Sequence, residues 1–113
     1  MQLPISMILV IIRMKVLAEK RKELSQTIAL LIGAMRTENG CLRCNFYQSM
    51  EDENELCILE EWDTRKNLNS HLKSERFRVL RGANNLLQEP YEMVFHNVRA
   101  VKKRTEARSQ TAV

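Results

Sequence analysis

The chain has 113 residues, of which 44% are hydrophobic and 28% are charged, and its formal net charge is +4. This length and composition predict one globular domain with its own hydrophobic core, and they exclude a disordered or fibrous chain. The longest apolar run, residues 7–12, is far shorter than the roughly 20 residues of a membrane-spanning helix, and no basic segment precedes it as in a signal peptide. We therefore expect a cytoplasmic protein that does not associate with a membrane.

Most of the positive charge lies at the C-terminal end of the chain. Residues 102–113 include four basic residues and one acidic residue, so the rest of the chain is nearly neutral. Nucleic-acid binding needs basic residues gathered on one face, with aromatic rings among them for single strands, and neither pattern is present. We expect no nucleic-acid partner, and we divide the chain into a domain of residues 1–101 and a mobile, polar and basic tail of residues 102–113.

Hydrophobic periodicity predicts the elements of the first half in chain order. Residues 6–16 form a strand that begins with a continuous apolar run. Residues 19–38 form an amphipathic helix, because apolar residues recur there at steps of three and four, and Gly40 is the expected stop signal. Residues 41–48 and 56–62 are strands joined by a polar hairpin loop.

The second half completes a recognisable order of elements. Asp63 or Thr64 caps a short helix, and Ser74 starts a second helical piece that Pro90 ends. Residues 91–101 return to strand character. The order strand, helix, strand, strand, helix, strand predicts an α+β, ferredoxin-like βαββαβ fold, in which a four-stranded antiparallel sheet carries its helices on one face.

The first strand also makes a prediction about assembly. Residues 7–12 offer hydrophobic side chains to both faces of the sheet, but helices cover only one face. Two copies packed sheet against sheet would bury the other face. The sequence therefore predicts a homodimer with a two-fold axis.

Several short motifs occur together in an order that is typical of a known family. They are Gly40-Cys41-Leu42, a polar hairpin with Asp52, Glu53 and Asn54, Glu60-Glu61-Trp62, His71-Leu72-Lys73-Ser74, and Phe77. In these motifs residues 7–101 resemble the antibiotic biosynthesis monooxygenase family, whose members are dimeric α/β barrels of ferredoxin-like subunits. The resemblance implies oxygenation of a small hydroxylated aromatic or quinol-type substrate, without metal or other cofactor, in a pocket between the sheet and the helices.

The same resemblance implies roles for individual residues. Trp62 and His71 fall on matching family positions, so His71 would be the base that removes a phenolic proton and Trp62 the platform beside the substrate. Independently of the resemblance, strand alternation puts Glu60 on the same face as Trp62, where it would be a buried acid or the partner that orients His71; an ion pair with an arginine, such as Arg13, is the favoured interpretation. The remaining candidates for substrate contact are Ile58, Leu68, Leu72, Phe77 and Tyr47.

Departures from the family pattern keep other functions open. Ile58 and Leu68 are apolar near positions where active members carry polar groups, and Arg76 replaces a second histidine. These departures favour the alternative of a non-catalytic dimer that binds a small ligand. Haem binding and degradation, which some relatives perform, would use His71 as the axial ligand, but residues 7–16 lack the Asn that such relatives carry on this strand.

Cys41 and Cys44 have the C-x-x-C spacing of redox and zinc motifs. In a strand, residues three apart point to opposite faces, so we expect the two sulfurs to diverge. Cys57 should lie near Gln48, at the far end of the ladder from Cys41. We therefore expect three free thiols in a reducing compartment, with no disulfide and no metal site.

Overall fold

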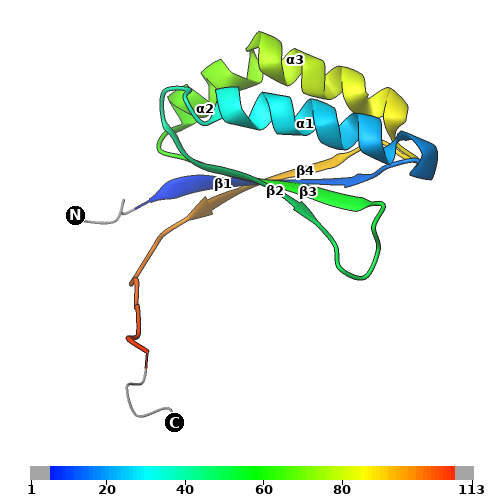
Figure 1. The fold of residues 1–113 in the computed structure, drawn as a ribbon. Helices are drawn as coiled ribbons and strands as arrows, with labels where there is room; N and C mark the ends of the chain where they lie inside the picture. The colour runs from blue at the N-terminus through cyan, green and yellow to red at the C-terminus, as the bar shows by residue number, and fades with distance from the viewer. Residues whose placement is uncertain (1–5, 109–113) are drawn as a thin grey trace.

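A computed structural model of the protein describes residues 6–108. They form a four-stranded antiparallel sheet in the order β2-β3-β1-β4, with every helix on the same face (Figure 1). The strands are β1 (Met7–Lys15), β2 (Cys41–Gln48), β3 (Glu55–Trp62) and β4 (Glu92–Val98), and the helices are α1 (Arg21–Met35), α2 (Arg65–Leu72) and α3 (Glu75–Gly82). The predicted α+β, ferredoxin-like fold is confirmed, with its second helical region divided into α2 and α3.

The helical piece that begins after Ser74 is shorter than the sequence predicts. Ser74 caps α3, because its hydroxyl accepts a hydrogen bond from the Phe77 amide at 3.2 Å. However, α3 ends at Gly82 and a short 3₁₀ turn follows, so a helix that continues to Pro90 is wrong. The reason is backbone pairing with the end of β1. The Gln88 amide donates to the Lys15 carbonyl at 2.7 Å, and this bond requires an extended chain near Gln88.

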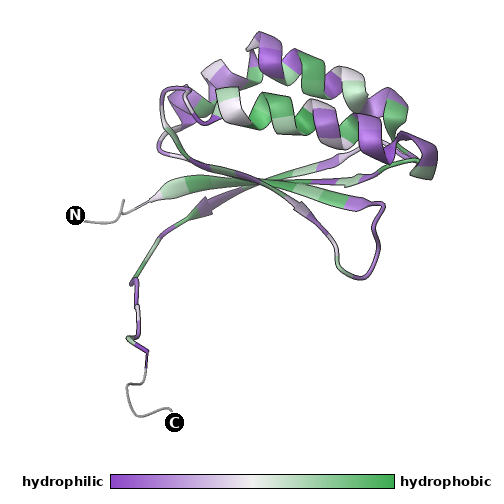
Figure 2. Cartoon of the chain, in the orientation of Figure 1, coloured by the Kyte–Doolittle hydropathy of each residue, from purple (hydrophilic) through white to green (hydrophobic). Residues whose placement is uncertain are grey.

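The hydrophobic core lies between the sheet and the helices. Alternate residues of β1 and β3 face the helices and pair across the ladder, as in Ile8 with Trp62 and Val10 with Glu60. Figure 2 shows the hydrophobic stretch of β1 and the mixture of hydrophobic and hydrophilic residues along the helices. The helices contribute these buried side chains to the core: Leu24, Ile28, Ile32, Met35, Leu68, Phe77 and Leu80.

The opposite face of the sheet also carries apolar side chains. We call it the open face, and its half-buried apolar residues in β1, β3 and β4 are Met7, Leu9, Ile11, Leu59, Val94 and Val98. No helix within residues 6–108 lies over this face (Figure 1). The open face thus keeps an apolar row along β1, in which Ile11 lies between Leu59 and Val94 while Leu9 lies between Glu61 and His96.

Beyond β4 the described chain has no helix or strand. Residues 99–108 extend away from the sheet on the side opposite the helices (Figure 1). The rest of the predicted tail, residues 109–113, lies outside the described residues, as do residues 1–5. None of the helices in residues 6–108 has the length and apolar character needed to cross a membrane.

A β-bulge corrects the prediction for Cys41 and Cys44. Cys41 pairs with Trp62 and Cys44 pairs with Glu60, and the register shifts between Cys41 and Arg43. Trp62 and Glu60 share one face of β3, so both cysteines face the helices, and the expectation that they point to opposite faces is wrong. The extra residue of a bulge changes which side chains share a face, and this is why simple alternation fails here.

Candidate functional site

The junction between β3 and α2 is fixed by a close approach of two loops. The Asp63 amide donates to the Gly40 carbonyl at 2.9 Å, and the Thr64 hydroxyl caps α2 by accepting from the Asn67 amide at 3.1 Å. Gly40 has a φ of +83°, and a Cβ at this position would clash with the side chains of Asp63 and Asn67. Only glycine fits both requirements without strain, so Gly40 allows residues 36–40 to pack against the start of α2.

This packing brings together a buried polar cluster, which we define as Glu38, Glu60, Trp62 and His71. The Trp62 indole nitrogen donates to Glu60 Oε1 at 2.8 Å. His71 Nδ1 lies 3.1 Å from both carboxylate oxygens of Glu38, and His71 Nε2 lies 3.6 Å from Glu60 Oε1. The imidazole of His71 is therefore held between two carboxyl groups that come from opposite sides.

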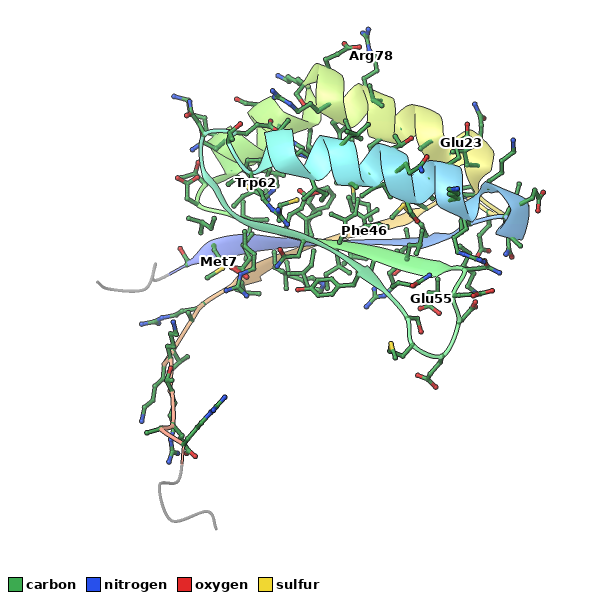
Figure 3. All side chains as sticks on the ribbon, viewed as in Figure 1. Met7, Glu23, Phe46, Glu55, Trp62 and Arg78 are labelled. Carbon is green, nitrogen blue, oxygen red and sulfur yellow. The ribbon has the colours of Figure 1, made fainter. Side chains whose placement is uncertain are left out.

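Aromatic packing holds the same imidazole in place. The rings of Trp62 and His71 are stacked, with centroids 4.6 Å apart and planes at 28°, and the Phe77 ring meets His71 edge-on at 5.6 Å. Glu60 and Trp62 are 0% exposed and His71 is 1% exposed. Figure 3 shows Trp62 in the layer between the sheet and the helices. Such packing restricts His71 to one orientation.

Burial affects the protonation of Glu60. Burial raises the pKa of Glu60; the Trp62 hydrogen bond and the positive charge of a protonated His71 oppose this effect, and Glu38 adds to it. An ionised carboxylate only accepts hydrogen bonds, so an ionised Glu38 places the proton of a neutral His71 on Nδ1. Glu60 Oε2 and His71 Nε2 have no hydrogen-bond partner among the described residues. A proton exchanged by this cluster would therefore occupy the space between Glu60 and His71 Nε2.

The contacts of Glu60 decide between the two roles that its sequence position left open. Arg13 pairs with Glu92 at 3.4 Å on the open side of the sheet, so an ion pair between Arg13 and Glu60 is wrong. Glu60 instead contacts the Trp62 indole and lies next to His71. Glu38 was missed by the sequence analysis, because it lies in a loop 33 residues before His71 and follows no hydrophobic or motif pattern.

The predicted substrate-contacting residues are not all brought together. Tyr47 pairs with Cys57 on the open face and is 50% exposed, so the sheet separates it from His71. Ile58 and Phe77 are buried core residues. Leu68 and Leu72, on α2, line a surface cavity.

That cavity, here called the α2–β4 cavity, has a volume of about 240 Å³. Its apolar lining comes from Ile8, Leu68, Leu72 and Phe95, and its polar lining from Arg65, Asn69, His96 and Asn97. It adjoins the buried polar cluster, since Ile8 pairs with Trp62 and Leu68 precedes His71 by one helical turn. Of four cavities of about 240 to 340 Å³ in the described part of the chain, none is lined by Trp62, Glu60 or His71.

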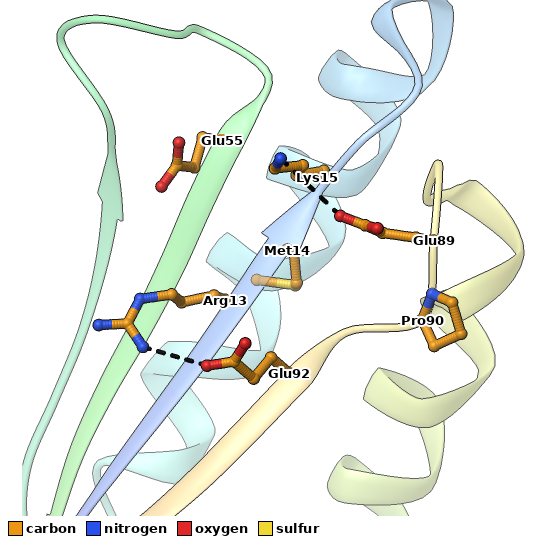
Figure 4. Close-up of a pocket in the computed structure, with 7 residues that line it drawn as sticks. All are labelled: Arg13, Met14, Lys15, Glu55, Glu89, Pro90 and Glu92. Atoms are coloured by element: carbon orange, nitrogen blue, oxygen red, sulfur yellow. Dashed lines mark hydrogen bonds and ion pairs between the residues drawn. The ribbon is translucent and has the colours of Figure 1, made fainter.

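A second cavity lies at the other end of β1 and has a volume of about 300 Å³ (Figure 4). It is lined mainly by charged residues that pair with one another: Arg13 with Glu92 at 3.4 Å, and Lys15 with Glu89 at 3.9 Å. None of the candidate residues from the sequence lines this cavity. The α2–β4 cavity is therefore the better candidate for a ligand site.

The cysteines of β2 lie close to the buried polar cluster but are poor nucleophiles. Burial, followed by the nearby charge of Glu60, raises the pKa of Cys41 to about 11 and that of Cys44 to about 12. Both thiols, and that of Cys57, are free in the described structure. Residues 6–108 contain no group of three or more His, Cys, Asp or Glu side chains with the geometry of a metal site.

Comparison with known proteins places this site in a family context. A conserved protein from Methanosarcina mazei Go1 is 26% identical, with a TM-score of 0.78 over 82% of this chain and 93% of that chain. Rv0793 from Mycobacterium tuberculosis is 23% identical, with a TM-score of 0.77 over 88% and 99% of the two chains. A crystal structure named antibiotic biosynthesis monooxygenase is 21% identical, with a TM-score of 0.76 over 82% and 99%.

No curated protein matches the chain. The sequence model of the antibiotic biosynthesis monooxygenase family, however, matches residues 7–82, from the start of β1 to the end of α3. This match includes all four residues of the buried polar cluster, and the structural neighbours share the surrounding fold. The chain therefore belongs to the antibiotic biosynthesis monooxygenase family.

Proposed function

We propose that this protein is a monooxygenase that oxidises a small hydroxylated aromatic or quinol-type molecule bound in the α2–β4 cavity. The observation that carries the proposal is the buried polar cluster beside this cavity. It holds a histidine between two carboxyl groups, stacked on an indole, within a chain whose family is named for monooxygenases. This arrangement suits general-base chemistry, because its histidine is fixed in orientation and shielded from water.

The proposed reaction balances without an external electron donor. A hydroxyarene and dioxygen give a quinone and water, so one oxygen atom enters the substrate and the substrate supplies all the electrons. Removing the phenolic proton first makes the ring a stronger electron donor. In this scheme Glu38 keeps the His71 proton on Nδ1, and Nε2 accepts the substrate proton.

The scheme requires a local movement. His71 is buried and does not line the α2–β4 cavity, whereas its α2 neighbours Leu68 and Leu72 do. Leu72 is only half-buried, so its side chain is the one expected to move when a substrate enters. Substrate binding would then connect His71 Nε2 with the cavity.

Oxygen consumption tests the proposal directly. Purified protein treated with chelator should consume oxygen with at least one member of a panel of dihydroxynaphthalenes and quinols. His71→Gln should lower the rate by about 100-fold or more, the usual contribution of a positioned base. Glu23→Gln, at an exposed position on α1, is the matched control and should leave the rate unchanged.

Folding of each variant is checked by its thermal unfolding temperature. The proposal fails if no substrate in the panel supports oxygen uptake, or if folded His71→Gln protein retains the full rate.

A second candidate function is ligand binding without catalysis. The observation in its favour is that Trp62 and His71 are buried and line none of the four cavities. A ligand that raises the thermal unfolding temperature with no oxygen consumption would support this function, because binding to the native state stabilises it whether or not a reaction follows.

We also propose that the protein works as a homodimer joined through the open face. The support is the row of half-buried apolar residues in β1, β3 and β4 that no helix of residues 6–108 covers. Sheet-to-sheet packing would bury this surface in a symmetric interface and leave the α2–β4 cavity, on the helix side, accessible in each subunit.

A further inference from the structure

We propose that the α2–β4 cavity selects planar aromatic molecules that carry an anionic substituent, with Phe95 stacking on the ring and Arg65 pairing with the anion. The inference rests on the proposed function only in taking this cavity as the substrate site. It adds a chemical class of ligand and two binding residues that the sequence analysis did not single out.

Phe95 supplies an accessible aromatic face. It pairs with Val10 on the helix side of the sheet, yet it is 47% exposed because β4 is an edge strand and the cavity opens beside it. A half-exposed phenylalanine next to the apolar side chains of Ile8 and Leu72 offers stacking and hydrophobic contact to a flat ring. The volume of about 240 Å³ limits the ligand to a small ring system.

Arg65 supplies the charge complementarity. It is the only Lys, Arg, Asp or Glu residue that lines the α2–β4 cavity. None of the ion pairs within residues 6–108 includes Arg65, so its guanidinium has no carboxylate partner in the described structure. A guanidinium can form two parallel hydrogen bonds with a carboxylate, which is the geometry expected for a ligand anion beside Arg65.

A neighbouring cavity indicates on which side of Arg65 the anion is expected. This cavity has a volume of about 340 Å³, and it shares Ile8, Arg65 and Asn97 with the α2–β4 cavity. Arg65 therefore stands where the two cavities meet. Asp63 lines only the neighbouring cavity, and its carboxylate accepts a hydrogen bond from the Asn67 side chain at 2.9 Å. The anion is thus expected on the α2–β4 side of Arg65.

The test compares two ligands that share one ring system and differ in charge and by one methyl group, 1-hydroxy-2-naphthoate and its methyl ester. Dissociation constants are measured by isothermal titration calorimetry without oxygen, so that no turnover occurs. The anion should bind about tenfold more tightly than the ester, as expected for one charge-assisted pair. Arg65→Gln should remove this difference, while Arg65→Lys should retain part of it. Arg78→Gln, at an exposed position on α3, is the control and should change neither constant.

Phe95→Ala should weaken binding of both ligands, because stacking does not depend on the charge. The inference is overturned if the anion and the ester bind equally, or if Arg65→Gln weakens both ligands alike. Anion binding that depends on Arg65, without oxygen consumption in the separate assay, would reject the monooxygenase and leave this inference intact. Oxidation of neutral quinols at a rate that Arg65→Gln does not alter would support the monooxygenase and reject the preference for anionic ligands.

Discussion

Glu60 is a carboxyl group enclosed by protein on every side. Its neighbours are the Trp62 indole, the His71 imidazole and, on the adjacent strand β2, the thiols of Cys41 and Cys44. Because burial raises the pKa of Glu60 above its ordinary value of 4.5, the folded protein retains this proton at pH values where the unfolded chain has lost it. Glu60 therefore makes stability depend on pH.

The sign of this dependence follows from proton binding. Between pH 4.5 and the raised pKa of Glu60, the folded state binds more protons than the unfolded state, so the free energy of unfolding falls as the pH rises. Glu60→Gln should remove this contribution, which is at most about 1.4 kcal/mol per pH unit for one proton. The glutamine can still accept the Trp62 hydrogen bond. Urea unfolding from pH 4.5 upward measures the slope.

Other groups do not obscure this measurement. The Cys41 and Cys44 thiols titrate near 11 and 12, outside the measured range, and Glu38 and His71 are present in both proteins. Glu61→Gln is the control, since Glu61 is the next residue of β3 and faces the open side near Arg43. An equal slope in the wild type and in Glu60→Gln would contradict the prediction.

Single residues also show where prediction from the sequence ends. Trp62 and His71 could be singled out because they are rare residue types at motif positions, and the structure stacks their rings. Glu38 could not, since only the fold brings residues 33 apart into contact. Arg65 and Phe95 could not be singled out for a related reason: the proposal for them rests on a missing carboxylate partner for Arg65 and on the incomplete burial of Phe95, and only the fold shows these features.

At the scale of elements, the turn before β2 positions Glu38. The Cys41 amide donates to the Glu38 carbonyl at 3.1 Å, and Gly40 follows with its positive φ beside Asp63 and Asn67. Gly40→Ala should lower the free energy of unfolding by more than about 1 kcal/mol, because alanine is strained at this φ and its Cβ would clash. Chemical denaturation measures the change.

Gly33→Ala is the matched control for this prediction. Gly33 lies within α1, and a Cβ there would meet no atom within 4 Å. The substitution should therefore stabilise the protein by about 0.5–1 kcal/mol through helix propensity. A Gly40→Ala protein as stable as the wild type would show that the turn does not need glycine.

The elements that follow simple periodicity were predicted well, and those that need tertiary pairing were not. The buried positions of β1 and α1 follow from alternation and from three-and-four spacing. The bulge in β2 and the early end of α3 depend on backbone hydrogen bonds to distant strands. No local pattern encodes these bonds.

At the scale of the whole molecule, the open face predicts the assembly state. The wild-type protein should be a dimer by size-exclusion chromatography with light scattering. Ile11→Lys should give a monomer, because Ile11 lies at the centre of the open face between Leu59 and Val94, and a lysine there would bury an unpaired charge.

Leu30→Lys is the control for the dimer prediction. Leu30 is 81% exposed on α1, on the other side of the molecule, so the substitution should leave the mass unchanged. A monomeric wild type, or an Ile11→Lys protein that remains dimeric, would contradict a contact through the open face.

The bulge in β2 has a consequence for how copies of this chain meet at high concentration. β2 is the outermost strand of the sheet on its side, and an outermost strand can template the addition of strands from other chains. The bulge between Cys41 and Arg43, together with the exposed charge of Arg43, interrupts the row of backbone partners at this end of β2. The addition of a strand from another chain is thereby discouraged at this end of β2.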